Sequence, residues 1–173
     1  IITYHPETMS LTSPLEQVEE LIKVLDEYQE LFMVITLSNA DVGGRAISRR
    51  LNEFASERKN VVVHASLGQE AYLSCLASFD LVIGNSSSAI IEAPIFGLPT
   101  VNIGGRQTGR EMAPSVINVD CKYESIKAGV DDALRRPKYL KQNIYDLPYG
   151  KLGATASILA VLEQFSSKQV RSV

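Results

Sequence analysis

The stretch GNSSSAIIEAPIFGLPTVNIGGRQTGRE, residues 84–111, decides the fold expected for this chain. It follows the apolar run LVI at residues 81–83, which has the length and composition of a buried β-strand. The stretch opens with a hydroxyl-rich turn, continues into a helical segment that contains Glu92, and then reaches a second strand. Arg106 and Arg110 come after that strand. In an α/β protein this order predicts a site for a nucleotide diphosphate.

Strand and helix signals alternate along the rest of the chain. Ser13-Pro14-Leu15-Glu16 forms a capping box with proline at the first helical position, which predicts a helix that begins there. The apolar face of this helix is expected to contain Leu15, Val18, Leu21, Ile22 and Leu25. The apolar run at residues 31–37 has the length of a strand buried on both faces. Other strands are expected at residues 1–4, 61–64, 81–83, 100–103 and 116–119, and other helices at 44–57, 69–78, 87–96, 123–134 and 154–165.

This alternation predicts the fold class. Strands separated by helices of about ten to fifteen residues form βαβ units and a parallel sheet. We therefore expect a doubly wound, Rossmann-like α/β domain over residues 1–173, with a frayed tail at residues 166–173. The chain begins with a strand signal and without an initiator methionine, so we interpret it as a piece of a longer protein.

Composition limits the function classes. At 173 residues and 45% hydrophobic the chain can bury one ordinary core. No segment approaches the roughly 20 apolar residues of a membrane span, and no leader pattern is present, so a cytoplasmic protein is expected. Cys75 and Cys121 lack metal-ligand spacing and are expected to be reduced thiols. A net charge of -3 argues against a nucleic-acid surface.

Polar residues follow most of the expected strands. In a doubly wound sheet, ligands bind outside the carboxyl ends of the strands. The candidate positions are therefore His5, Asn39, the loop at residues 65–68, the turn from Asn85 to Ser88, and residues 104–110.

Asn85, Ser86, Ser87 and Ser88 follow a strand and open a helix. Their hydroxyls and backbone N–H groups point where the helix dipole favours an anion. Asn and Ser are also the preferred N-cap residues, so the alternative is a turn and cap only. Four such residues in succession exceed what capping requires, which favours phosphate binding together with capping. A nucleophilic serine is disfavoured, because the second glycine of G-x-S-x-G is missing and the histidines show no triad partner.

Glu92 lies among apolar residues of the same helical segment. A carboxylate in such company is unfavourable unless it meets a cation or accepts hydrogen bonds. The two vicinal hydroxyls of a ribose would satisfy it, and the alternative is a solvated helix face. Pro94 is expected to kink or restart the helix and so to redirect the turn that contains Glu92.

Arg106 and Arg110 place two permanent cations beside the proposed anion site. The glycines before Arg106 allow the backbone to approach a ligand closely, which favours Arg106 over Arg110. Arg110 has an alternative pairing with Glu111 or Glu7.

His5 ends the first strand before Pro6, where it can donate to a phosphate oxygen. Its alternative is an ordinary loop residue or a packed ring, and Asn39 has the same two interpretations. His64 and the loop at residues 65–68 offer hydrogen bonds to a base.

Three segments together resemble a known family: YHPET at residues 4–8, GNSSSAIIEAPIFGLPTVNIG at 84–104 and GRQTGRE at 105–111. They are similar to the C-terminal half of UDP-N-acetylglucosamine 2-epimerases, especially the hydrolysing branch. The match follows the element order over essentially the whole chain. It implies the C-terminal half of a two-domain fold of the glycosyltransferase B (GT-B) type, with UDP in the cleft. The TERPE-like segment of the nonhydrolysing branch is replaced here by TGRE, which favours hydrolysis.

The resemblance also implies roles for single residues. It assigns the diphosphate to Ser86 and Ser87, the ribose hydroxyls to Glu92, the phosphates to His5 and the anionic end to Arg106. Asn39 falls at a polar nucleotide contact, and the backbone of Ala65, Ser66 and Leu67 falls where the family binds uracil. Asn85, Ser88 and Arg110 are further candidates. No metal or other cofactor is expected.

Family chemistry is the elimination of UDP from UDP-N-acetylglucosamine. Hydrolysing members then add water to give N-acetylmannosamine, a precursor of sialic-acid-type sugars. The family's catalytic carboxylates belong to the N-terminal half, so the resemblance implies that this chain alone is inactive. The expected partners are a UDP-sugar, the missing N-terminal domain and, at full length, further copies of the protein, with no nucleic acid and no membrane. A GT-B glycosyltransferase and a noncatalytic UDP-binding module remain as alternatives.

Overall fold

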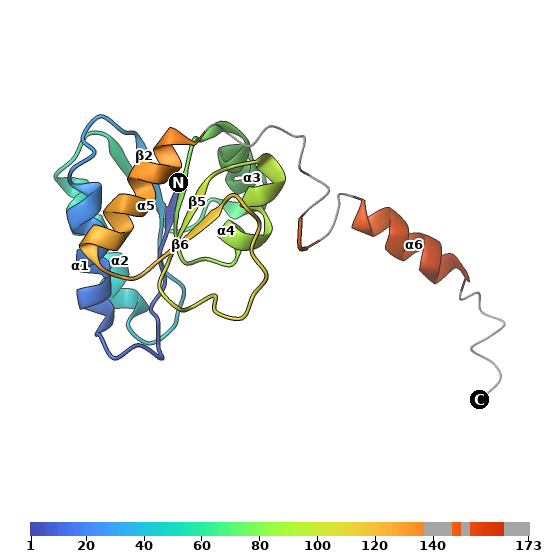
Figure 1. The fold of residues 1–173 in the computed structure, drawn as a ribbon, viewed down its shortest axis with the longest axis horizontal. Coiled ribbons are helices and arrows are strands. Elements are labelled where there is room, and N and C mark those ends of the chain that lie inside the picture. Colours follow the sequence, from blue (N-terminus) through green and yellow to red (C-terminus); the bar gives the residue numbers. More distant parts are fainter. Residues whose placement is uncertain (137–146, 150–152, 165–173) are drawn as a thin grey trace.

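A parallel sheet of six strands forms the centre of the computed structural model, which describes residues 1–136, 147–149 and 153–164 (Figure 1). The strands are β1 (Ile2–Thr3), β2 (Met33–Thr36), β3 (Val61–His64), β4 (Val82–Gly84), β5 (Thr100–Ile103) and β6 (Val116–Val119). Their order across the sheet is β3-β2-β1-β4-β5-β6, and every pair of neighbours is parallel. The predicted doubly wound α/β class is confirmed.

The strand order reverses between β1 and β4. From β1 the chain builds outward to β3, then returns to β4 on the other side of β1. In doubly wound sheets such a switch point opens a crevice at the carboxyl ends of the strands. β1 and β4 meet there with Thr3 opposite Gly84, where the φ angle of Gly84 is 139° and a Cβ would lie 1.9 Å from the carbonyl oxygen of Thr3. Only glycine fits this approach.

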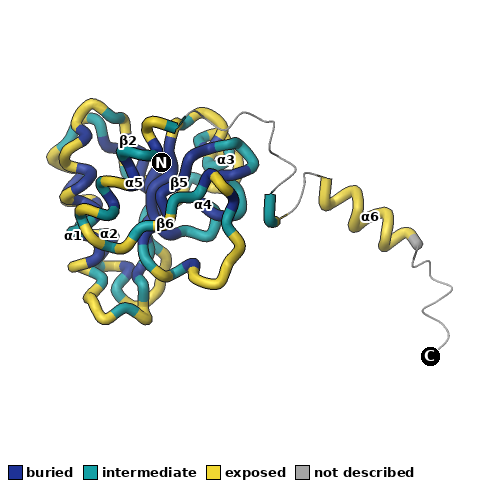
Figure 2. Tube along the Cα trace, viewed as in Figure 1, coloured by how far each residue is buried: buried dark blue, intermediate teal, exposed yellow. Residues whose placement is uncertain are grey.

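Helices cover both faces of the sheet (Figure 1). α1 (Pro14–Leu25), α2 (Gly44–Ser56) and α5 (Tyr123–Arg135) pack on one face, and α3 (Gly68–Ser78), α4 (Ser88–Ile91) and the 3₁₀ helix η1 (Ala93–Phe96) pack on the other. The larger core, on the first face, contains Leu21, Leu25, Ile47, Leu51 and Ile126. The smaller core contains Leu76, Ala89, Ala93 and Leu98. Figure 2 shows the buried residues concentrated along the strands between these two layers.

α1 begins where the capping box predicted. The side chain of Ser13 accepts from the backbone N–H of Glu16, and Glu16 Oε2 accepts in return from the N–H of Ser13 at 2.7 Å. The predicted inward position of Leu15 is wrong, because this residue of the first turn is exposed. Gln17 is buried instead, since its amide bonds to backbone groups of Glu7 and Thr12.

The segment predicted as one helix at residues 87–96 is divided in two. α4 ends at Ile91, Glu92 lies at the joint, and η1 starts at Ala93. Pro94 has no N–H to continue the α-helical ladder, which explains the break. The expected kink therefore takes the form of a change of helix type, with Glu92 at the junction.

α6 (Ala154–Gln164) lies apart from the sheet in Figure 1, and its residues Ala154–Glu163 are exposed (Figure 2).

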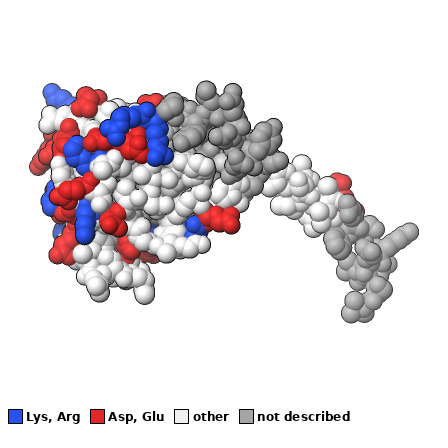
Figure 3. Space-filling view, in the orientation of Figure 1, with Lys and Arg blue, Asp and Glu red and all other residues white. Residues whose placement is uncertain are grey.

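Across the described residues, none of the helices has both the length and the apolarity needed to span a bilayer. The predicted tail at residues 166–173 lies outside the described residues. Acidic and basic side chains are interspersed on the face shown in Figure 3. Among the ion pairs of the described residues, Lys127 of α5 pairs with Glu27 and with Asp131.

Candidate nucleotide-binding site

The loops after β1 and β4 are joined through the side chain of Asn85. This side chain is fully buried; its Oδ1 accepts from the backbone N–H of His5 and its Nδ2 donates to the backbone oxygen of His5, both at 2.8 Å. The backbone N–H of Asn85 also donates to Thr3. The buried amide of Asn85, which the sequence named as a candidate ligand, positions the backbone of His5 at the switch point.

The backbone oxygen of Asn85 organises the loop after β5. It accepts from Gln107 Nε2 at 2.7 Å and from Arg106 Nη1 at 3.3 Å. Gln107 is buried, and its Oε1 has no hydrogen-bond partner among the described residues. The second nitrogen of the Arg106 guanidinium, Nη2, lies 3.6 Å from Asp41 Oδ2, in the loop after β2. Arg106 therefore lies between the β2 and β4 loops, with one contact to each.

Glu7 holds the loop after β5 against the loop after β1. Its Oε2 accepts from the backbone N–H of Gly105 at 3.0 Å. A Cβ at Gly104 would lie 2.3 Å from the same oxygen, and one at Gly105 would lie 2.7 Å from Oε1, so neither position accommodates a side chain in this arrangement. Among the described residues Arg110 forms neither of its suggested ion pairs, with Glu7 or with Glu111. The Glu7 carboxylate accepts from the Gly105 backbone instead.

His5 is a neutral hydrogen-bond donor at this edge. Its Nδ1 accepts from the backbone N–H of Asn39 at 3.1 Å, which leaves the proton of the neutral ring on Nε2. Burial, and secondly the positive charge of Arg106, lower the pKa of His5 below its ordinary value. Asn39 in turn donates from Nδ2 to Asp41 Oδ2 at 2.7 Å. The sequence pattern had treated His5 and Asn39 separately, and the structure links them.

The three serines lie where β4 passes into α4. Ser87 is the N-cap residue, but its hydroxyl makes no capping hydrogen bond. Ser86 Oγ lies 3.2 Å from Ser88 Oγ, which lies 2.5 Å from the hydroxyl of Tyr72 on α3. Burial raises the pKa of Tyr72, so its hydroxyl keeps its proton at neutral pH. The side-chain capping bond expected at this turn is therefore not formed by Ser87, and phosphate binding by the serines stays a prediction.

One pocket beside the serines has a volume of about 440 Å³. Its walls come from the end of β2, the loop after β3, the start of α3 and the junction of α4 with η1: Thr36, Leu37, Ala65, Ser66, Leu67, Gly68, Gln69, Tyr72 and Glu92. The structure thus brings Glu92 to the same pocket as the predicted base loop, although about 25 residues of sequence separate them. We call this the nucleoside pocket.

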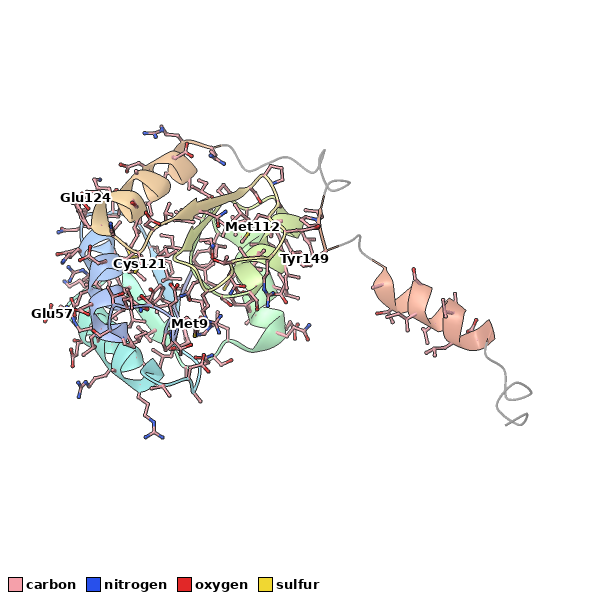
Figure 4. The ribbon with its side chains drawn as sticks, turned by 60° about the horizontal axis from the view of Figure 1, so that its bottom comes forward. Met9, Glu57, Met112, Cys121, Glu124 and Tyr149 are labelled. Carbon is pink, nitrogen blue, oxygen red and sulfur yellow. The ribbon has the colours of Figure 1, made fainter. Side chains whose placement is uncertain are left out.

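A second pocket, of about 310 Å³, lies at the loops after β1, β2 and β5. It is lined by Pro6, Glu7, Thr8, Met9, Asp41, Gly105, Arg106, Gln107 and Arg110. We call this the anion pocket; Met9, labelled in Figure 4, marks its rim. Sequence reasoning did not find Asp41 or Tyr72, and it included Gln107 only within the candidate range 104–110, because their importance depends on partners in other loops.

A third cavity, also about 310 Å³, lies at the amino ends of the strands. Its walls are mainly apolar, with Phe32, Phe79 and Leu81 among them. The predicted site residues gather at the opposite edge of the sheet.

The strand order and the polar loops at its switch point define a doubly wound α/β domain of the nucleotide-binding type. Residues 1–163 match the family model described as UDP-N-acetylglucosamine 2-epimerase, and the chain belongs to this family. The resemblance drawn from the sequence is thereby confirmed.

Named relatives agree with this assignment. The chain is 34% identical over 145 residues to UDP-N,N'-diacetylbacillosamine 2-epimerase (hydrolyzing) of Legionella pneumophila, covering 84% of the chain and 38% of the relative. It is 31% identical over 166 residues to polysialic acid biosynthesis protein P7 of Escherichia coli, covering 95% and 42%. The chain thus spans about two fifths of the length of these relatives.

A solved structure confirms the fold. The UDP-GlcNAc 2-epimerase of Methanocaldococcus jannaschii, in complex with UDP-GlcNAc and UDP, superposes with a TM-score of 0.67 at 14% identity. The superposition covers 94% of this chain and 44% of the other. The six-stranded sheet is therefore one Rossmann-like half of the GT-B type of fold.

Proposed function

We propose that this chain is the UDP-binding half of a hydrolysing UDP-N-acetylglucosamine 2-epimerase. The observation that carries the proposal is the turn from Asn85 to Ser88, which contacts both pockets: Arg106 of the anion pocket bonds to Asn85, and Tyr72 of the nucleoside pocket bonds to Ser88. A ligand with a nucleoside at one end and a diphosphate at the other matches this arrangement. The word "hydrolyzing" in the name of the Legionella relative supports the branch.

In this proposal the residues divide by pocket. Ser86, Ser87, the Nε2–H of His5 and the guanidinium of Arg106 bind the diphosphate, because each offers a donor or a positive charge at the switch point. Glu92 accepts from the two ribose hydroxyls, and the backbone of residues 65–67 meets the base. Asn39 supports this set through its bonds to His5 and Asp41.

The proposed reaction has two stages. A base removes the proton at C2 of the sugar, the C1–O bond breaks, and UDP leaves with the bonding electrons; water then adds at C1 and a proton returns to C2 from the other face. The described residues bind and stabilise the leaving diphosphate. We place the base in an N-terminal half and expect the isolated 173-residue chain to show no turnover. The product, N-acetylmannosamine or a related sugar, leads to sialic-acid-type sugars, which the polysialic acid relative supports. We place the full-length protein in the cytoplasm as a homo-oligomer.

Calorimetric titration of the chain with UDP and with inorganic pyrophosphate tests the binding roles. Ser87→Ala should lower the affinity for both ligands, since it removes a hydroxyl that donates a hydrogen bond to a phosphate. Glu92→Gln should lower the affinity for UDP roughly tenfold and change the affinity for pyrophosphate by no more than about twofold. The reason is that a charged hydrogen bond to ribose is worth roughly 1.5 kcal/mol or more. Glu53→Gln, an exposed acid on α2, is the matched control and should change neither.

Four results would contradict the proposal. Absence of UDP binding by the wild-type chain would remove the nucleotide site, and equal losses of UDP and pyrophosphate in Glu92→Gln would exclude the ribose role. Release of N-acetylmannosamine from UDP-N-acetylglucosamine by the chain alone would refute the placement of the base. For the full-length protein, transfer of the sugar to an acceptor instead of its release would identify a glycosyltransferase.

A further inference from the structure

Asp41 and the proposed ligand share a partner. Arg106 is the cation proposed for the diphosphate, and the Asp41 carboxylate lies 3.6 Å from its Nη2 atom. Both a carboxylate oxygen and a phosphate oxygen bind a guanidinium through the same N–H groups. Asp41 and a diphosphate therefore compete for Arg106.

The charges in the anion pocket cancel. Its lining contains two arginines, Arg106 and Arg110, and two carboxylates, Asp41 and Glu7. His5 adds no charge at neutral pH, because burial and Arg106 lower its pKa. A pocket for a diphosphate would gain affinity from a positive surplus, so the presence of two carboxylates requires an explanation.

The two carboxylates differ in how they are held. Glu7 accepts from the N–H of Gly105 at 3.0 Å and is packed against Gly104, so it has a structural role in the loop. Asp41 accepts from Asn39 at 2.7 Å, but its side chain is 44% exposed and its contact with Arg106 is longer than a hydrogen bond. Asp41 can therefore turn toward water when another anion takes Arg106 and still leave the loop after β5 in place, whereas a turn of Glu7 would break its bond to the Gly105 N–H.

We propose that Asp41 sets the charge selectivity of the diphosphate site, weakening the most highly charged ligands most. This inference rests on the proposed function. A terminal phosphate carries a charge of about -1.5 to -2 at pH 7, and the same phosphate esterified to a sugar carries about -1. The carboxylate therefore disfavours UDP relative to a UDP-sugar, which assists the release of UDP as product.

The test compares wild type, Asp41→Asn and Asp132→Asn by calorimetry with UDP, UDP-N-acetylglucosamine and pyrophosphate at low salt. Asp132 is the matched control, because it also pairs with an arginine, Arg136, and is 42% exposed, but it lies on α5. Asp41→Asn should raise the affinity for UDP and for pyrophosphate by about 1.5- to fivefold, the range for an exposed ion pair, and the affinity for UDP-N-acetylglucosamine by less. The gain should shrink as salt rises.

A double-mutant cycle with Arg106→Gln separates competition for Arg106 from general repulsion. If Asp41 acts by competing for Arg106, most of the gain from Asp41→Asn disappears when Arg106 is already replaced. An equal gain in both backgrounds would overturn the competition, as would an equal gain from Asp132→Asn.

The same measurements distinguish a failure of this inference from a failure of the proposed function. A wild-type chain that binds UDP, with Asp41→Asn no tighter, overturns the role of Asp41 and leaves the proposed function intact. A gain for UDP-N-acetylglucosamine as large as that for UDP overturns the selectivity. A wild-type chain and variants that all fail to bind UDP overturn the proposed function and this inference with it.

Discussion

The anion pocket and the nucleoside pocket lie at the same edge of one sheet but are constructed differently. Loops after β1, β2 and β5 form the anion pocket. The fully buried Asn85 bonds to the β1 loop through its side chain and to the β5 loop through its backbone oxygen, and the carboxylate of Glu7 holds the β5 loop as well. The nucleoside pocket has the loop at residues 65–67 as one wall, of which Ala65 and Ser66 are exposed, and its side-chain hydrogen bonds among the described residues are fewer. Substitutions in the anion pocket should therefore lower the free energy of unfolding as well as the ligand affinity. Substitutions in the nucleoside pocket should mainly lower the ligand affinity.

The largest expected effect is on the junction of the anion pocket. Asn85→Ala removes both amide bonds to the half-buried His5 and leaves its backbone N–H and C=O without these partners. Urea denaturation should show a loss of about 2–4 kcal/mol in the free energy of unfolding, because each unsatisfied buried group costs about 1–3 kcal/mol. The control is Asn52→Ala on the exposed side of α2, where the amide bonds to Ser48. Similar losses in the two variants would show that the buried amide of Asn85 contributes no more to stability than an exposed amide does. The contrast between the pockets would then be removed.

A smaller effect is expected at the wall of the nucleoside pocket. Tyr72→Phe deletes the hydroxyl that lies 2.5 Å from Ser88 Oγ, while Ser86 remains as a partner of Ser88. The free energy of unfolding should fall by about 1 kcal/mol, the usual worth of one neutral hydrogen bond. Tyr149→Phe, which alters an exposed tyrosine, serves as the control in the same denaturation experiment. A loss as large as that of Asn85→Ala would show that both pockets are equally tied to the core.

The smallest effect concerns pH and His5. Its pKa is lowered in the folded chain by burial and by Arg106, so as pH falls the unfolded chain takes up the proton first. The contribution of neutral His5 to stability is complete above the ordinary histidine value of about 6.5 and is lost as pH falls below it. Wild type should lose stability between pH 7 and pH 5 more steeply than His5→Gln. Parallel curves for the two proteins would contradict the lowered pKa.

The secondary structure was largely predictable because it depends on local patterns. The capping box located the start of α1, and continuous apolar runs located strands such as β2. Errors occurred where packing overrode periodicity. Leu15 belongs to the apolar stripe of α1 but is exposed, while Gln17 is buried because backbone groups of other segments satisfy its amide.

The candidate site was predictable in its location but not in its connections. Residues after parallel strands meet at one edge, so His5, Arg106 and the Asn85–Ser88 turn were expected together. Their individual partners lie far apart in sequence: Asn85 and His5 are separated by 80 positions, and Gly105 and Glu7 by 98. No local pattern reports such pairs, and for this reason Asp41 and Tyr72 were missed and Gln107 was given no role of its own.

By itself the sequence determined the alternation of strands and helices, the family resemblance and the polar character of the stretch at residues 84–111. Only the tertiary structure decided what each polar group does there. It buried Asn85 as a bridge, directed Glu7 to the glycine backbone and placed Asp41 beside Arg106. The physical reason is that hydrophobic periodicity reports which side of an element faces the core, whereas the partners of loop side chains depend on how distant strands are ordered in the sheet.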